Sequence, residues 1–455
     1  MNTKKSETQF YKPLTTIIVM VVMMFTAMVY YQADPQIPLM FGCLAAGLVS
    51  IWMGFSWEEI LQGALKGITN SLEAILILLL IGVLVGVWIA CGTVPAMIYY
   101  GLKIISVRFF LPASMIICVI VAFAIGSWGT VGTVGLAFMG MGTALQIPAP
   151  VVAGCIVSGA YMGEVISPLS DATNLTSAVV GENVFQIVRK MAKPAIIACG
   201  ITLAGYFVIG GKYTGAADTA LTSNIQPLTD NIKEQFVITP LGLAPMALMA
   251  ACILLKFPAI PAMLAGILCG MAEAVTLQHT GMSQLLDVSY NGFVCNSGNT
   301  LIDHLLSAGG MNEMLYSISI IIIAMSFGGI MQHTKQIQCL ITPLIRRVRS
   351  KGSLGSLTVL SCICMNVILP DQYLGISLPG QMYEATYTER KIGKTNLGMT
   401  LLGGGAVTSP LIPWNTCGIY VLTVLGVAPA AYAPFAFYSV ILPLVVIILG
   451  YLDKQ

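Results

Sequence analysis

Residues 163–175 read GEVISPLSDATNL and place two carboxylates, a proline and several hydroxyl and amide side chains inside an otherwise apolar part of the chain. A helix cannot run smoothly through Gly163 and Ser167-Pro168, because proline lacks a backbone donor and clashes with the preceding turn. Unwound backbone is tolerated in a bilayer only where it is buried in protein or lines a wet cavity. This stretch therefore predicts a broken helix whose carbonyls and polar side chains face a polar site.

The surrounding composition is that of a membrane protein. Of the 455 residues, 57% are hydrophobic and only 9% are charged, against about 25% charged in a soluble domain. Many apolar blocks approach the ~20 residues that cross a bilayer. They cover residues 14–31, 37–55, 74–91, 109–126, 194–211, 239–256, 258–277, 315–331, 354–369 and 430–452. We expect an all-α polytopic membrane protein with about 10–13 transmembrane helices.

The remaining composition excludes several function classes. The chain has twelve Cys and three His without the spacing of a metal site, and it carries no catalytic constellation such as HExxH, so neither an enzyme nor a resident cofactor is expected. No basic face suited to nucleic acid exists. We interpret the Cys as packing residues in a reducing context. The basic residues expected on the cytoplasmic side are Lys4, Lys5, Lys12, Arg346, Arg347, Arg349 and Lys351.

The chain contains an internal repeat. Residues 163–169 (GEVISPL) agree with residues 405–411 (GAVTSPL) at five of seven positions. At the same offset Thr173-Asn174 meets Asn415-Thr416, and the apolar run 74–91 meets 316–333. Two related halves are the usual build of a secondary transporter, although duplication of a scaffold without functional symmetry would leave the same trace. We expect two repeats, inverted in the membrane, that contain broken helices or re-entrant hairpins.

This repeat divides the chain into five regions. Residues 1–70 form N-terminal spans and an amphipathic connector, and residues 71–211 form the first repeat. A polar linker, 212–238, leads to intervening spans and a connector, 239–312, and the second repeat covers 313–455.

Symmetry brings four polar stretches together, namely 126–133, 163–175, 366–373 and 405–416. Their carboxylate, hydroxyl and amide oxygens suit a hard cation rather than a soft metal. The expected ion- or substrate-binding residues are Asp171, Glu164, Ser167, Ser170, Thr173, Asn174, Asp371, Ser127, Thr130, Asn415 and Thr416. Among them, Asp171, Thr173 and Asn174 are the expected sodium ligands.

Each acidic residue also has a structural interpretation. Asp171 could cap a following helix, Glu164 could be a structural or gating charge beside a vestibule, and Asp371 could lie in an interfacial loop. A carboxylate within a spanning region is by default functional, because it is costly there. Glu73 is better explained as a first-turn acid favoured by the helix dipole. The three histidines, His279, His304 and His333, are not assigned a role.

Several motifs resemble those of the NhaC-type sodium/proton antiporter family. They are GSWGTVGT at 126–133, ISPLSDATNL at 166–175, DQYLGISLPG at 371–380 and AVTSPLIPWNTCG at 406–418, supported by IACGTVPAMIYYGL at 89–102. The resemblance covers about residues 85–455. It implies a homodimeric, multi-pass antiporter of the bacterial plasma (inner) membrane, within a family that includes malate–lactate exchangers.

The chain departs from the family pattern at two places. Glu164-Val165 stands where the family commonly has Asp-Lys, and Gly403-Gly404-Gly405 stands where an acid is often found. A glycine run leaves room for a bulkier substrate. We expect exchange of sodium for protons by alternating access, with Asp171 and either Glu164 or Asp371 binding one or the other. The alternative is a sodium- or proton-coupled exchanger of small organic acids or amino acids.

Overall fold

Helices form nearly all of the regular structure in the computed structural model, which confirms the all-α expectation. It describes residues 11–31, 33–104, 107–220, 226–255, 257–298, 303, 306–337, 339, 350–369 and 371–452. Within these ranges no strand forms, and Phe293 and Ala308 make an isolated antiparallel bridge. The residues discussed above that lie outside the described ranges are Lys4, Lys5, His304, Arg346, Arg347 and Arg349.

One group of helices, called here the arm bundle, packs around α17 and α5. Its members are α2 (Tyr11–Phe25), α3 (Gln36–Trp52), α4 (Trp57–Asn70), α5 (Leu72–Ala90), α14 (Ala259–Thr276), α15 (Met282–Asn291) and α17 (Met311–His333). Glycines allow α4 and α17 to touch, since a Cβ on Gly67 would lie 2.0 Å from the Met325 carbonyl oxygen. Such close contacts between small residues are the usual means of helix association in a bilayer.

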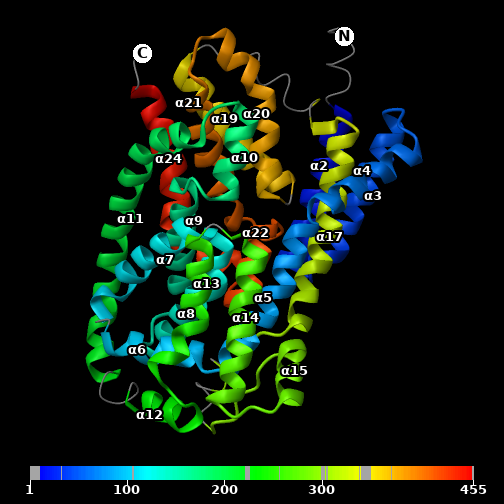
Figure 1. The fold of residues 1–455 in the computed structure, drawn as a ribbon. Coiled ribbons are helices and arrows are strands. Elements are labelled where there is room, and N and C mark those ends of the chain that lie inside the picture. Colours follow the sequence, from blue (N-terminus) through cyan, green and yellow to red (C-terminus); the bar gives the residue numbers. More distant parts are fainter. Residues whose placement is uncertain are drawn as a thin grey trace.

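A second group, called the core bundle, surrounds α9 and α10 (Figure 1). Its members are α7 (Val107–Thr130), α8 (Leu136–Ala144), α9 (Ala149–Ile166), α10 (Asp171–Val180), α11 (Val184–Ala220), α19 (Lys351–Ile368), α20 (Gln372–Glu389), α21 (Lys394–Leu401), α22 (Thr416–Leu425), α23 (Pro429–Tyr432) and α24 (Phe437–Leu452). Helix α9 is buried from Val151 to Val165. It approaches α7 through Gly159 and Gly163, where an added Cβ would lie 2.5 Å from the carbonyl oxygens of Met115 and Val119.

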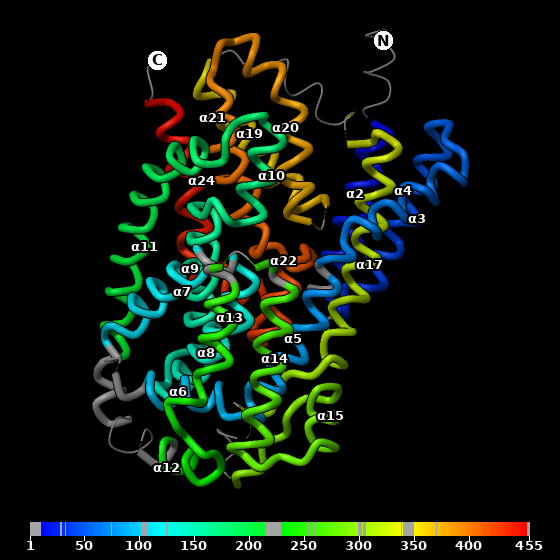
Figure 2. Tube along the Cα trace, in the orientation of Figure 1, coloured from blue at the N-terminus to red at the C-terminus, as the bar shows by residue number. Residues whose placement is uncertain are grey.

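The remaining helices lie at the lower end of the molecule in Figure 2 or connect the two bundles. They are α6 (Thr93–Ile104), α12 (Gln226–Gln235) and α13 (Ala244–Leu254). The polar stretch 212–238, expected as a linker, is partly helical, because α11 continues to Ala220 and α12 follows. Short π-helical and 3₁₀-helical turns lie between these helices: η1 (Thr26–Tyr30), η2 (Val131–Gly135), η4 (Pro240–Leu243), η5 (Leu402–Ala406), η6 (Ser409–Leu411) and η7 (Ala433–Phe435).

The apolar helices confirm a chain that crosses the membrane several times. Among the described residues, five helices are long and apolar enough to span a bilayer, and two further pairs would do so as bent spans. The pair formed by residues 416–425 and 429–435 bends by 88°. Five more apolar helices have 10–17 residues, which is less than the ~20 residues of a full crossing. The count of about 10–13 spans and the repeat relationship therefore stay predictions.

Candidate ion-binding site

The first broken helix lies where the opening motif was expected to interrupt α9. Helix α9 ends at Ile166, Ser167 and Ser170 adopt extended backbone conformations, and α10 begins at Asp171. The Ser167 hydroxyl donates to the carbonyl oxygen of Phe123 on α7 at 2.6 Å. The break is thereby fixed to the neighbouring helix rather than left as a loose loop.

The carbonyls released by this break are bound by side chains that follow it. Thr173 Oγ1 donates to the carbonyl oxygens of Ser167 at 2.5 Å and Ser170 at 2.9 Å. Asn174 Nδ2 donates to the Pro168 oxygen at 3.1 Å and to the Ser170 oxygen at 2.8 Å. Thr173 and Asn174 therefore shape the turn, and neither the Asn174 amide oxygen nor the Asp171 carboxylate takes part in these bonds.

The second broken helix has a parallel construction. Helix α21 runs into η5, η6 contains Pro410, and α22 begins at Thr416 after Asn415. Asn415 Oδ1 accepts from the Cys417 backbone N–H at 3.1 Å and caps α22, while its Nδ2 donates to the Asn366 carbonyl oxygen at 3.3 Å. Thr416 is buried in the first turn. Asn415 thus has a helix-capping role in this conformation.

The glycines before this break do not leave open space. A Cβ on Gly403 would lie 2.8 Å from Val446, one on Gly404 would lie 2.8 Å from the Val359 carbonyl oxygen, and one on Gly405 would lie 2.8 Å from Ile376. The expectation that this run makes room for a bulkier substrate was wrong. Neighbouring helices fill the volume that larger side chains would have occupied.

A third break occurs in α7 at the stretch GSWGTVGT. Gly126 has φ 76° and ψ 174°, a conformation that is essentially restricted to glycine. Thr130 Oγ1 donates to the Gly126 carbonyl oxygen at 2.8 Å. Trp128 stacks on Tyr420 of α22 with ring centroids 4.5 Å apart, and the Tyr420 hydroxyl donates to the Trp128 carbonyl oxygen at 2.5 Å. The break in α7 is therefore joined to the second broken helix.

Asp371 is the N-cap of α20. Its carboxylate accepts from the backbone N–H of Leu374 at 3.0 Å, and its side chain is buried. The adjacent Gln372 accepts from the Cys417 thiol through Oε1 at 2.9 Å. The structure thus gives Asp371 a structural task and directs Gln372 to the interior.

Glu164 lies at the centre of the converging elements and is only 6% exposed. Its carboxylate lies near the Ser127 hydroxyl of α7, the Gln372 amide of α20 and the carboxylate of Asp171. None of these neighbours is a cation. A buried carboxylate in an apolar interior requires a proton or a positive charge, because desolvation of the isolated anion is costly.

Several polar atoms around Glu164 have no hydrogen-bond partner within the described part of the chain. They are Glu164 Oε2, Ser127 Oγ, Gln372 Nε2 and Tyr161 Oη, and the Oγ of Ser170, the N-cap of α10, also has none. A buried polar atom without a partner costs about 1–3 kcal/mol. We refer to Ser127, Tyr161, Glu164, Gln372 and Cys417 as the central polar cluster; its unsatisfied atoms are the feature expected of a site that receives a solute.

The sequence did not single out Tyr161, Gln372 and Cys417 as members of the site. Tyr161 lies three residues before Glu164 and therefore on the same face of α9. Cys417 was interpreted as a packing residue, and Gln372 was included only as part of the polar stretch 366–373. Outside this cluster, Glu73 in the first turn of α5 is close enough to Asp171 for the two like charges to repel each other. Glu73 thus brings an acid of the arm bundle to the edge of the core-bundle site.

No group of three His, Cys, Asp or Glu side chains with metal-binding geometry occurs among the described residues. His279 follows α14, and His333 lies in the last turn of α17.

Apolar helices whose breaks meet around a buried carboxylate without a cationic partner define a secondary carrier. Comparison with known proteins agrees with this class. Residues 6–173 and 159–454 match the model of the Na+/H+ antiporter family. The chain belongs to this family, and it is a multi-pass plasma-membrane protein.

Three relatives cover nearly the whole chain. The Na(+)/H(+) antiporter NhaC of Alkalihalophilus pseudofirmus is 35% identical over 95% of this chain and 94% of its own length. The malate-2H(+)/Na(+)-lactate antiporter of Bacillus subtilis is 34% identical over 94% and 91%, respectively. The arginine/ornithine antiporter ArcD of Halobacterium salinarum is 32% identical over 97% and 92%. All three are named as antiporters, which confirms the transporter class expected from the sequence.

Proposed function

We propose that the protein is a secondary active transporter that exchanges sodium for protons across the plasma membrane by alternating access. The observation that carries this proposal is the Glu164 carboxylate, buried without a cationic partner among unsatisfied polar atoms. Either a proton or a sodium ion neutralises it. The NhaC relative, which is named as a Na(+)/H(+) antiporter, supports the choice of these two cations.

Asp171 and Glu164 have different tasks in this proposal. Asp171 stands at the start of α10, where it is accessible, and it attracts sodium together with the amide oxygen of Asn174. Glu164 lies deeper and exchanges a proton against the ion, assisted by Ser127 and the free hydroxyl of Ser170. Thr173 holds the turn through its bonds to backbone carbonyls and offers its remaining lone pair to sodium.

The other predicted ligands act mainly through position. Asp371 and Asn415 cap α20 and α22, Ser167 fixes the first break to α7, and Thr130 bonds to Gly126. Thr416 follows its capping neighbour into α22. They keep the helix ends pointed at the central polar cluster. Exchange is obligatory because the Glu164 carboxylate is neutralised either by a proton or by the sodium ion that Asp171 attracts, and not by both.

The experiment uses purified protein in sealed liposomes with a trapped pH indicator and a sodium pulse. The wild type should acidify or alkalinise the lumen according to the direction of the gradient. Glu164→Gln should abolish the coupled proton signal, and Asp171→Asn should raise the KM for sodium by at least about tenfold, since a charged ligand is lost. Asp287→Asn, an exposed acid of α15, is the matched control and should transport normally. Normal sodium-driven proton movement in Glu164→Gln would contradict the proposal.

A second candidate function is exchange of a small organic acid or amino acid coupled to sodium or protons. The malate–lactate and arginine/ornithine relatives favour it, because their identities to this chain are similar to that of the NhaC relative. The same liposomes separate the two functions. A response to sodium alone supports sodium/proton exchange, whereas a response that requires trapped malate, lactate, arginine or ornithine identifies a solute exchanger. The expected homodimer is part of this proposal, and cross-linking in native membranes tests it.

A further inference from the structure

A cavity of about 380 Å³ is lined by residues of α11, α19, α21 and α24, and no residue of the central polar cluster lines it. Four basic side chains line it, namely Arg189, Lys190, Lys193 and Lys351. None of its lining residues, all within the described part of the chain, is acidic. Arg189 and Lys193 therefore present positive charge to any molecule that enters the cavity.

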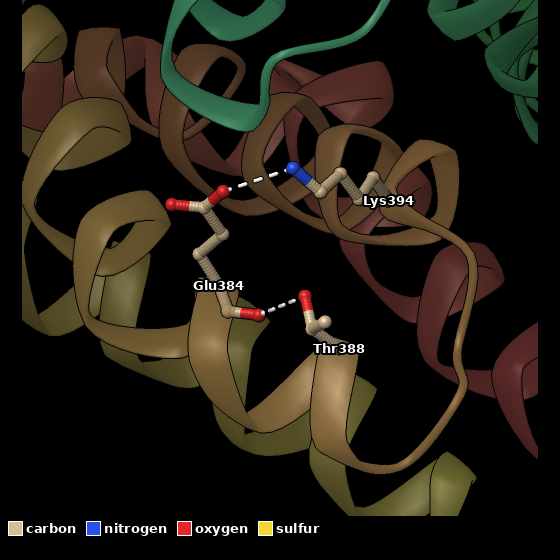
Figure 3. Close-up of polar contacts among 3 residues, drawn as sticks. All are labelled: Glu384, Thr388 and Lys394. Carbon is tan, nitrogen blue, oxygen red and sulfur yellow. Dashed lines mark hydrogen bonds and ion pairs between the residues drawn. The ribbon is translucent and has the colours of Figure 1, made fainter.

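Lys394 of α21 comes two residues before the cavity residue Asn396, but it forms an ion pair outside the cavity. Its Nζ pairs with a carboxylate oxygen of Glu384 on α20 at 3.0 Å, and the Glu384 carbonyl oxygen accepts from Thr388 Oγ1 at 3.0 Å (Figure 3). Glu384 is thus neutralised by Lys394, and this ion pair does not include Arg189 or Lys193 of the cavity.

Apolar side chains form another part of the cavity wall. They are Ile392 before α21, Met399 of α21 and Leu449 of α24. Outside the cavity, α11 exposes Ile196 and Ile201, and α24 exposes Leu444 and Ile448. In a membrane protein such exposed apolar side chains face the acyl chains of lipids. A molecule bound here would have its charged end among the basic residues and its apolar part along α11 and α24.

The basic residues also indicate the membrane side. Helix α11 starts, and α24 ends, at the upper end of Figure 1, where α2 also begins. This end carries the cavity cations and Lys12. Lysine and arginine accumulate on the cytoplasmic side of membrane proteins. The cavity therefore opens to the cytoplasmic leaflet, which contains anionic phospholipids.

We propose that this cavity is a binding site for an anionic phospholipid, whose phosphate is held by Arg189 and Lys193 and whose acyl chains lie along α11 and α24. A guanidinium group presents paired donors that match phosphate oxygens, and basic pockets between transmembrane helices are known to take lipid headgroups. The apolar wall selects a lipid over a free phosphate ion. This site stands apart from the transport residues and does not depend on the proposed function.

The test measures lipid binding to the purified full-length chain by native mass spectrometry. The probe is phosphatidylglycerol, with phosphatidylcholine and inorganic phosphate as comparison ligands. Arg189→Gln/Lys193→Gln should bind phosphatidylglycerol more weakly by about 5-fold for each charge removed. Lys66→Gln/Lys212→Gln removes two exposed charges outside the cavity and should bind as the wild type does. Arg189→Lys keeps the charge and should retain most of the affinity.

Three results would overturn this assignment. The first is equal phosphatidylglycerol binding by the wild type and the cavity variant. The second is an equal loss in the control variant, which would show a general effect of surface charge. The third is displacement of the lipid by inorganic phosphate at similar concentration, which would identify a soluble anion as the ligand. The melting temperature without added lipid verifies that each variant is folded, and Arg189→Lys supplies the comparison if the glutamine variant is not.

Discussion

At the scale of single residues, the central polar cluster contrasts with the hydrogen-bonded tyrosines around it. Tyr161 and Tyr206 are both fully buried in the core bundle. The Tyr206 hydroxyl shares hydrogen bonds with Ser158 and with the carbonyl oxygens of Gly154 and Phe435. Tyr161 Oη has no such partner, although it lies near Cys417 and Glu164. One hydroxyl stabilises the fold, and the other is available to a solute.

This contrast predicts opposite effects for the same substitution. Tyr161→Phe removes an unsatisfied buried hydroxyl, so the melting temperature should stay the same or rise, while transport falls and the KM for sodium increases. Tyr206→Phe removes the donor to the Phe435 carbonyl oxygen and the partner of the buried Ser158 hydroxyl, so it should cost about 1–3 kcal/mol of stability, with the KM unchanged. Thermal unfolding in detergent and the liposome assay provide both readouts. A loss of stability in Tyr161→Phe with normal transport would place this hydroxyl in the packing instead of the site.

At the scale of single elements, the site residues lie at breaks in the helices, and the break in α7 depends on one glycine. Gly126 has φ 76°, and an added Cβ would meet nothing within 4 Å. A larger residue at position 126 is therefore disfavoured by the backbone conformation and not by a clash with neighbouring atoms. Gly200 of α11 is a suitable comparison, because its Cβ would also meet nothing within 4 Å but its backbone lies in a regular helix.

We predict that Gly126→Ala and Gly200→Ala change the stability of the protein in opposite directions. Gly126→Ala should destabilise the protein by about 1–3 kcal/mol and reduce sodium/proton exchange, because Ser127 would move away from Glu164. Gly200→Ala should be neutral or should stabilise the protein by up to about 1 kcal/mol, as alanine favours a helix. Thermal melting and transport in the same preparations check both changes. Equal effects of the two substitutions would show that the break has no special role.

The helix breaks were largely predictable from sequence, whereas the tasks of the residues beside them were not. Pro168 and the polar residues after it indicated an interruption, and the structure places one there, ending α9 at Ile166. The sequence could not show that Asp371 caps α20 or that Thr173 binds the released carbonyls, because these bonds depend on local backbone geometry. Gln372 and Cys417 escaped detection because they become neighbours only when α20 and α22 pack. The glycine run was misinterpreted for the same reason: its neighbours come from distant helices.

At the scale of the whole molecule, alternating access requires the core bundle to move relative to the arm bundle. Helix α17 of the arm contacts α22 of the core, where the hydroxyls of Ser317 and Thr423 are hydrogen-bonded. Glu73 of α5 interacts with Asp171 across the same division. The site residues themselves all belong to the core bundle or to its breaks. We therefore expect the two bundles to slide past each other at these contacts while the site travels with the core.

A disulfide between the bundles tests this movement. In Ser317→Cys/Thr423→Cys, oxidation should join α17 to α22 and stop transport, and reduction should restore it. Ser50→Cys/Thr334→Cys is the matched control, because Ser50 Oγ donates to Thr334 Oγ1 at 3.2 Å within the arm bundle, so its disulfide joins no moving parts. The native cysteines in the described part of the chain are free, and the single variants report any pairing with them. If the oxidised Ser317→Cys/Thr423→Cys protein, verified as cross-linked, still exchanged sodium for protons at the wild-type rate, the carrier would work without movement between α17 and α22. The moving boundary would then have to lie within the core bundle, at the breaks of α7, α9 and α22.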